Sequence, residues 1–182
     1  MKSFLVSVSL SFALMFAFAY SASAQERATN EARVSPNASV SQTIGTTQVT
    51  ITYGRPSVKG RQVFGGLEPY GSVWRTGANE ATTITFSDDV LIEGEPLQAG
   101  TYGLFTVPGE DEWVVIFNNV PNQWGAFDYD SSEDALRVKV SPEEAHHIEQ
   151  LMFYFEDVTS DSGTAVVHWS TIKVPFTIES AS

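Results

Sequence analysis

The sequence has no cysteine and is short of positive charge: its 182 residues include 10 Lys and Arg against 22 Asp and Glu, a formal charge of −12. Without cysteine, the chain can form neither a disulfide scaffold nor a thiolate metal site. The lack of basic residues argues against nucleic-acid binding, because neutralising phosphates requires a basic surface. Hydrophobic residues make up 42% and aromatic residues 12%, which is too apolar for a disordered chain. The length fits one domain with a substantial core.

Histidine is also scarce, with three residues, and the sequence offers little that points to a metal or nucleophile site. His146 and His147 are adjacent and point in different directions in either a strand or a helix, and His168 stands in an apolar run. The sequence contains neither a His-Glu-x-x-His zinc motif nor a Gly-x-Ser-x-Gly nucleophile turn. The acidic stretch 128–134 has Glu133 at the sixth position, where a calcium loop requires glycine. We therefore expect no metal ion and no cofactor.

The first 24 residues have the three parts of a secretory signal peptide. Lys2 supplies a positive start, residues 4–20 form an apolar run, and Ala22 and Ala24 give a small-residue cleavage site before Gln25. The alternative interpretation is an uncleaved membrane anchor, for which a run of 17 residues is at the short limit. We expect export to the periplasm or out of the cell, with no membrane association after the signal is removed.

Beyond the signal, we expect a flexible leader over 25–38 and a single domain over 39–180. The dominant pattern in the domain is an alternation of apolar and polar residues, which is typical of half-buried strands. About nine strands are predicted, at 47–53, 81–87, 90–92, 101–107, 113–117, 136–140, 148–158, 164–169 and 172–178. Short strands separated by turn residues indicate an all-β fold, an antiparallel β-sandwich.

Two local signals modify this prediction. Residues 141–145 could form one short helix, because Ser141 is a good N-cap and Pro142 fits the first helical position. Pro175 falls inside the last predicted strand, and proline lacks the N–H that a central strand donates. We therefore expect that strand to be at an edge or to contain a bulge.

One long segment interrupts the strand pattern. The 27 residues from Gly54 to Glu80, here called the excursion, lie between two predicted strands and show no sustained period. Loops of this length are usually functional or disordered. Disorder would leave Val63, Phe64 and Trp74 in water, so we predict that the excursion is folded and packed.

The excursion is also a basic island. Arg55, Lys59, Arg61 and Arg75 against Glu68 and Glu80 give it a net charge of +2, whereas the rest of the chain after the signal carries −15. Guanidinium groups beside exposed backbone amides and the side chain of Asn79 could receive a carboxylate, phosphate or sulfate. The alternative is structural: the arginines could bind backbone carbonyls of an irregular segment or pair with its acids. The sequence does not separate these two interpretations.

Several stretches resemble a family of exported bacterial proteins known as domain of unknown function 2911. They are Tyr-Gly-Arg-Pro-Ser-Val-Lys-Gly-Arg at 53–61, Pro-Tyr-Gly at 69–71, Trp-Arg-Thr-Gly-Ala-Asn-Glu-Ala-Thr at 74–82, and shorter blocks near 99–102, 123–125 and 136–138. The resemblance covers roughly residues 41–178, and Gly54 stands where many members have serine. It implies export and an all-β domain, and it carries over no assigned activity and no catalytic residues.

Three hypotheses for function follow. The first is a non-catalytic binding protein for a small anionic or polyhydroxylated ligand. Its predicted site residues are Arg55, Arg61, Arg75, Asn79 and Glu80, with Trp124 as a wall. The second is a hydrolase or isomerase with Glu80 as general base. The third is an envelope module with a protein-binding face, which predicts an exposed apolar patch or a free edge strand.

Overall fold

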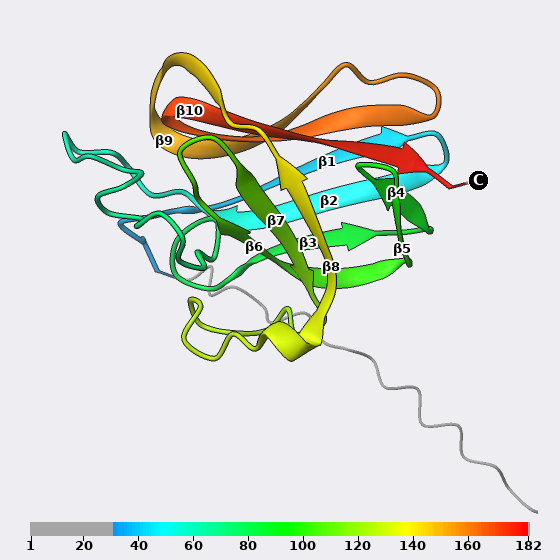
Figure 1. Ribbon diagram of the computed structural model, residues 1–182, viewed down its shortest axis with the longest axis horizontal. Coiled ribbons are helices and arrows are strands. Elements are labelled where there is room, and N and C mark those ends of the chain that lie inside the picture. The colour runs from blue at the N-terminus through cyan, green and yellow to red at the C-terminus, as the bar shows by residue number, and fades with distance from the viewer. Residues whose placement is uncertain (1–30, 182) are drawn as a thin grey trace, which may run out of the picture.

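The computed structural model describes residues 31–181, which form two antiparallel sheets facing each other (Figure 1). The strands are β1 (Asn37–Ile44), β2 (Thr47–Gly54), β3 (Thr82–Phe86), β4 (Val90–Ile92), β5 (Glu95–Leu97), β6 (Gly100–Val107), β7 (Trp113–Asn118), β8 (Asp134–Val140), β9 (Glu143–Glu156) and β10 (Ser162–Ser180). One sheet has the order β1-β2-β3-β6-β7-β8 and the other β5-β4-β10-β9. The predicted antiparallel β-sandwich is confirmed, with ten strands where the sequence predicts about nine.

The hydrophobic core lies between the sheets, because alternation along each strand turns one row of side chains inward. In β2 these are Val49, Ile51 and Tyr53, and from β10 Val167 and Phe176 belong to the same continuous cluster. Burying an apolar side chain of this size stabilises the fold by about 1.5–3 kcal/mol. This core holds the two sheets in a fixed relative position, and the irregular segments pack against them.

A second, smaller cluster covers the outer face of the larger sheet. Phe105 of β6 and Ile116 of β7 point away from the main core, yet both are fully buried. Val73 from the excursion and Tyr129 from the segment before β8 pack against them. This explains why β7 is a continuous apolar run in the sequence, since both of its faces are covered.

The helix predicted at 141–145 is wrong, because Glu143 begins β9. Glu143 and Glu144 are in register with Lys173 and Ile172 of β10, and the Lys173 ammonium lies 3.0 Å from the Glu143 carboxylate. The ladder of a long hairpin outweighs local capping signals, which contribute about 1 kcal/mol each. Within the described range the one helical element is a 3-10 turn, η1 (Ser131–Glu133).

The predicted strands 164–169 and 172–178 form one strand, β10, with an irregular register between His168 and Ile172. Of the two expectations for Pro175, the edge strand is wrong, since β10 lies between β4 and β9. Lys173 is the last residue in register with β9, and Ile178 is the first in register with β4. Pro175 lies between these two pairings, where its missing N–H interrupts neither ladder.

The predicted signal peptide (1–24) and the first part of the predicted leader (25–30) lie outside the described residues. Regular structure begins at Asn37, two residues before the predicted start of the domain at 39. No helix within residues 31–181 has the length and apolar character needed to cross a bilayer.

Candidate functional site

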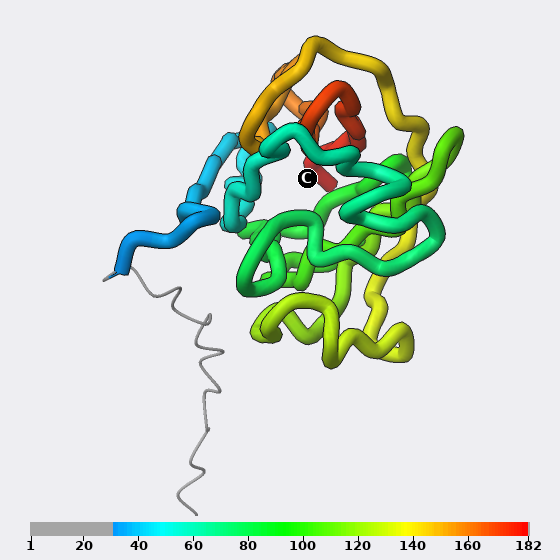
Figure 2. Tube along the Cα trace, turned by 90° about the vertical axis from the view of Figure 1, so that its left-hand side faces the viewer, coloured from blue at the N-terminus to red at the C-terminus, as the bar shows by residue number. Residues whose placement is uncertain are grey.

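The excursion closes one end of the sandwich, as the view turned by 90° shows (Figure 2). It is bonded to both sheets: Val58 N–H donates to Glu149 O of β9 at 2.8 Å, and Trp74 exchanges backbone hydrogen bonds of 2.8 and 2.9 Å with Thr106 of β6. Its own turns are closed by backbone bonds, including Glu68 N–H to Val63 O at 2.9 Å. Satisfied peptide groups let a segment without regular structure pack against the core.

Aromatic rings fasten the excursion to the sheets. Phe64 lies edge-on against Trp113 of β7, with ring centroids 4.8 Å apart, and also approaches Trp74 and Trp169 at 5.8 and 6.1 Å. Trp74 stacks on Trp169 of β10 at 5.7 Å. Such pairs add about 0.5–1.5 kcal/mol beyond the area they bury. The predicted packing of the excursion is confirmed.

A cavity of about 270 Å³ lies between the excursion and the segment before β1. Its polar and charged lining residues are Ser35, Ser57, Lys59, Arg61, Glu68 and Arg75, and the remainder of its wall is formed by Val34, Pro56, Leu67, Gly77, Ala78 and Trp169. Trp169 is only 1% exposed, so it lies at the inner end of the cavity. Three cationic side chains and one carboxyl therefore surround a single space.

The two arginines of this cavity are oriented by backbone carbonyls. Arg61 donates from Nε to Val58 O at 3.0 Å and from Nη2 to Ser57 O at 2.6 Å. Arg75 donates from Nε to Gly77 O at 3.3 Å. A guanidinium has five N–H donors, so most of those on Arg61 and Arg75 have no partner among residues 31–181. The arginines are thus held in place with donors left for a ligand.

Glu68 is the one carboxyl in the lining. Its side chain makes neither a hydrogen bond nor an ion pair with any residue in the described part of the chain. Burial raises its pKa to about 7, although the nearby charges of Arg75 and Arg61 act in the opposite direction. A carboxyl of this kind is found more often at functional sites than on ordinary surfaces.

Trp169 carries an unused donor at the inner end of the same cavity. Its indole N–H is buried and has no hydrogen-bond partner within residues 31–181. Leaving a buried donor unpaired costs about 1–3 kcal/mol. Its stacking partner Trp74 is satisfied, because that indole donates to Gly77 O at 3.2 Å. The Trp169 N–H is therefore an unpaired donor within the packed wall of the cavity, with less than 1 Å² of its nitrogen exposed.

The other predicted site residues do not line this cavity. Arg55 donates to Leu151 O at 2.9 Å, and Asn79 donates to Ser35 O at 3.0 Å, which are structural contacts. Trp124 is 53% exposed on the surface. Its neighbours bond the excursion, since Gly125 N–H donates to Asn79 O at 3.1 Å. Of the three predicted arginines, Arg61 and Arg75 line the cavity, whereas Arg55 lies outside it.

Glu80 is held in a closed ion pair. Arg33 binds both of its carboxylate oxygens, at 2.7 and 3.0 Å, and Glu80 is 6% exposed. A general base needs open space beside it for the group that it deprotonates. The structure therefore gives no support to the hypothesis of catalysis by Glu80.

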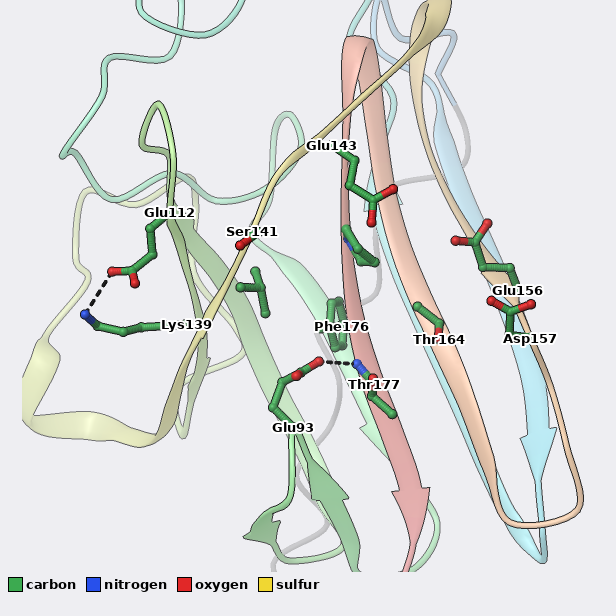
Figure 3. A pocket seen from close by; sticks show the side chains of 12 residues that line it. Glu93, Glu112, Lys139, Ser141, Glu143, Glu156, Asp157, Thr164, Phe176 and Thr177 are labelled. Atoms are coloured by element: carbon green, nitrogen blue, oxygen red, sulfur yellow. Dashed lines mark hydrogen bonds and ion pairs between the residues drawn. The ribbon is translucent and has the colours of Figure 1, made fainter.

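A larger cavity of about 480 Å³ lies at the open side of the sandwich, and its lining includes five acidic residues and one cation, Lys139 (Figure 3). Glu112 pairs with Lys139 at 2.8 Å, and Glu93 accepts from Thr177 N–H at 2.5 Å. In residues 31–181 no three His, Asp or Glu side chains are grouped as metal ligands. The one cation in the lining of this cavity is thus already paired, which makes the cavity a poor site for an anion.

Exposed apolar residues bear on the hypothesis of a protein-binding face. Val120, Trp124 and Phe127 come from one segment between β7 and β8 and are 41%, 53% and 82% exposed. If the protein has a protein-binding face, this segment is the exposed apolar surface that would form it.

The comparison with family models gives one match, to the family described as "Protein of unknown function (DUF2911)", over residues 35–178. The chain belongs to this family. The resemblance seen in the sequence is thereby confirmed, and the family description assigns no activity. No curated protein and no solved structure gives a significant match. The matched range includes every residue of the 270 Å³ cavity lining except Val34.

Three residues of the candidate site are missing from the predicted site residues: Lys59, Glu68 and Trp169. In the sequence Lys59 is only part of the basic island, Glu68 is a counter-charge within the excursion, and Trp169 is a core residue of a strand. Trp169 is 94 residues beyond Arg75, and only the tertiary fold brings the two to one cavity. An acid surrounded by the basic residues of an irregular segment is the sequence signal that points to Glu68.

Proposed function

We propose that this protein is an exported β-sandwich that binds a small anionic or polyhydroxylated ligand in the 270 Å³ cavity beneath the excursion. The observation that carries the proposal is the meeting of Lys59, Arg61 and Arg75 around one cavity in a chain whose net charge is −12. Guanidinium groups bind carboxylates, phosphates and sulfates through paired hydrogen bonds.

The orientation of the arginines also supports binding at this site. Arg61 and Arg75 are fixed by the carbonyls of Val58 and Gly77, so little side-chain freedom is lost when a ligand binds. An oxyanion with several oxygens would accept hydrogen bonds from both guanidinium groups at once.

The experiment is a binding screen by thermal shift and calorimetry with sulfate, phosphate, gluconate and glucose. Arg75→Gln removes a cation from the cavity, and Arg55→Gln removes one from the same segment but outside it. We expect Arg75→Gln to weaken anion binding roughly tenfold or more, because a hydrogen bond to a charged group contributes about 1.5–3 kcal/mol. Arg55→Gln should bind as the wild type does.

Two results of the screen would contradict the proposal. Absence of any stabilisation by these compounds would refute the proposal, and so would equal weakening by the two variants, since that would indicate a general effect of net charge. Binding of glucose as tight as that of gluconate would assign the site to hydroxyl groups in place of the anion.

Export is supported by the signal-like segment ending at Ala24. When the full chain is expressed in a bacterium with a secretion pathway, mass spectrometry should find a product that begins at Gln25. A variant with Ala24→Glu should stay unprocessed, because signal peptidase requires a small residue there. A wild-type product that retains all 182 residues would contradict cleavage and favour the anchor.

A further inference from the structure

The cavity combines three cations with one carboxyl that none of them neutralises. Arg61 and Arg75 are turned toward backbone carbonyls, at Val58 and Gly77, and neither forms an ion pair with Glu68. Lys59 is exposed, and its backbone N–H is held by the Glu149 carboxylate of β9 at 2.9 Å. The Glu68 carboxyl is therefore left facing the space that the proposed anion would fill.

An anion bound in this space would be repelled by the negative charge of an ionised Glu68. An ionised Glu68 would stand beside the bound oxyanion, and like charges at close range in a partly buried cavity repel each other strongly. A protonated Glu68 removes the repulsion, and its O–H becomes one more donor toward an oxygen of the ligand. Since burial already raises the pKa of Glu68 to about 7, the proton is available near neutral pH.

We propose that the cavity takes up its anion together with one proton, and that Glu68 binds the ligand as a neutral carboxylic acid. This inference rests on the proposed function of anion binding. The proton comes from solvent and adds to a Glu68 carboxylate oxygen, while no covalent bond of the ligand changes. Arg61 and Arg75 donate to the same ligand, so the protonated Glu68 and both guanidinium groups act as donors toward it.

A protonated Glu68 restricts the kinds of ligand that the cavity can bind. A site whose arginines and protonated carboxyl all donate suits an oxyanion rich in acceptor oxygens, such as a carboxylate, phosphate or sulfate group. A zwitterion such as an amino acid has an ammonium group beside its carboxylate, and this cation would favour the ionised form of Glu68. Uptake or release of a proton on binding therefore distinguishes the two kinds of ligand.

The test is calorimetry of the wild-type protein with sulfate and gluconate, whose charges stay constant from about pH 5.5 to 8.5. Titrations in two buffers with different ionisation enthalpies give the number of protons bound. We expect uptake approaching one proton near pH 8 and almost none at pH 5.5, where Glu68 already carries it. Above pH 7 the affinity should fall up to tenfold per pH unit.

Glu68→Gln is the matched variant, because its amide replaces the neutral acid with a donor that does not titrate. It should bind at pH 6 as tightly as the wild type within about threefold, take up no proton, and keep its affinity at pH 8.5. Circular dichroism of the variant confirms that it is folded, and the proton count on the wild type stands independently of it.

The outcomes separate the two claims. If neither anion binds at any pH, the proposed anion binding fails, and the role of Glu68 fails with it. If the anions bind without proton uptake, or Glu68→Gln keeps the wild-type pH dependence, anion binding stands and the role of Glu68 is refuted. Release of protons, or tighter binding of glycine than of gluconate, would also refute that role and assign the cavity to zwitterions.

Discussion

Arg33 and Glu80 form a two-pronged ion pair across 47 residues of sequence, with N–O distances of 2.7 and 3.0 Å. Beside this pair, Asn79 donates to Ser35 O, and Arg55 N–H donates to Pro36 O. The segment 33–36, which the sequence places in a flexible leader, is thus fastened to the excursion. Since Val34 and Ser35 line the candidate cavity, this attachment also builds part of its wall.

Substitution of Arg33 should therefore destabilise the domain. Arg33→Ala removes the two hydrogen bonds that the Glu80 carboxylate accepts from Arg33, and breaking an ion pair at a residue that is 6% exposed is costly. We expect the melting temperature to fall by a few degrees. The double variant Arg33→Ala with Glu80→Gln should recover most of the loss, because the amide carries no charge. Failure of the second substitution to recover stability would show that the pair acts through Arg33 packing alone.

In this chain Gly54 at the end of β2 should not tolerate a side chain, although many members of the family have serine at this position. A Cβ atom at this position would lie 2.2 Å from the backbone oxygen of Ala78, which cannot move without displacing the cavity wall. Overpacking of this kind costs about 1–3 kcal/mol. Gly54→Ala should therefore lower the melting temperature by several degrees, at about 2–4 °C per kcal/mol in a domain of this size.

The control for Gly54 is Gly71→Asn. Gly71 has a φ of 76° and open space where its Cβ would be, and asparagine tolerates this left-handed conformation better than other residues do. Its melting temperature should stay close to that of the wild type. An equal fall in melting temperature in the two variants would mean that the close approach of Gly54 to Ala78 does not explain the effect of Gly54→Ala.

Phe64 should be the anchor of the excursion. Its ring contacts Trp74, Trp113 and Trp169, which belong to the excursion and to both sheets. Phe64→Ala should cost about 3 kcal/mol in urea unfolding, the lower end for phenylalanine in a core, because Phe64 itself is only partly buried. The near-UV circular dichroism of the tryptophans should weaken as well. Phe64→Leu should retain more stability, and unchanged spectra in both variants would contradict the anchoring role.

The strands were predictable where one face alternates or the run is continuously apolar, as in β2 and β7. The start of β9 was not, because the capping signal of Ser141 is local while pairing with Lys173 comes from a distant part of the chain. The same limit applies to the site. Arg61 and Arg75 stand out by charge in an acidic sequence, but no local pattern connects Trp169 to them.

Glu68 should make stability depend on pH in the absence of ligand. Its pKa is about 7 in the folded protein, above the ordinary value of 4.5, so the native state binds more protons than the unfolded state between these two pH values. Its contribution is therefore complete below about pH 4.5 and is lost as the pH rises to about 7. The partly exposed side chain limits the effect to a few degrees in melting temperature.

Glu68→Gln isolates this contribution, because its amide stays neutral at every pH. The variant and the wild type should melt at nearly the same temperature at pH 4.5, and the variant should be the more stable at pH 8, by a few degrees. Glu110→Gln, at an exposed position outside the cavity, makes the same change in net charge and serves as the control. If the two variants gain equally at pH 8, the cause is relief of the overall negative charge, and Glu68 is an ordinary surface acid.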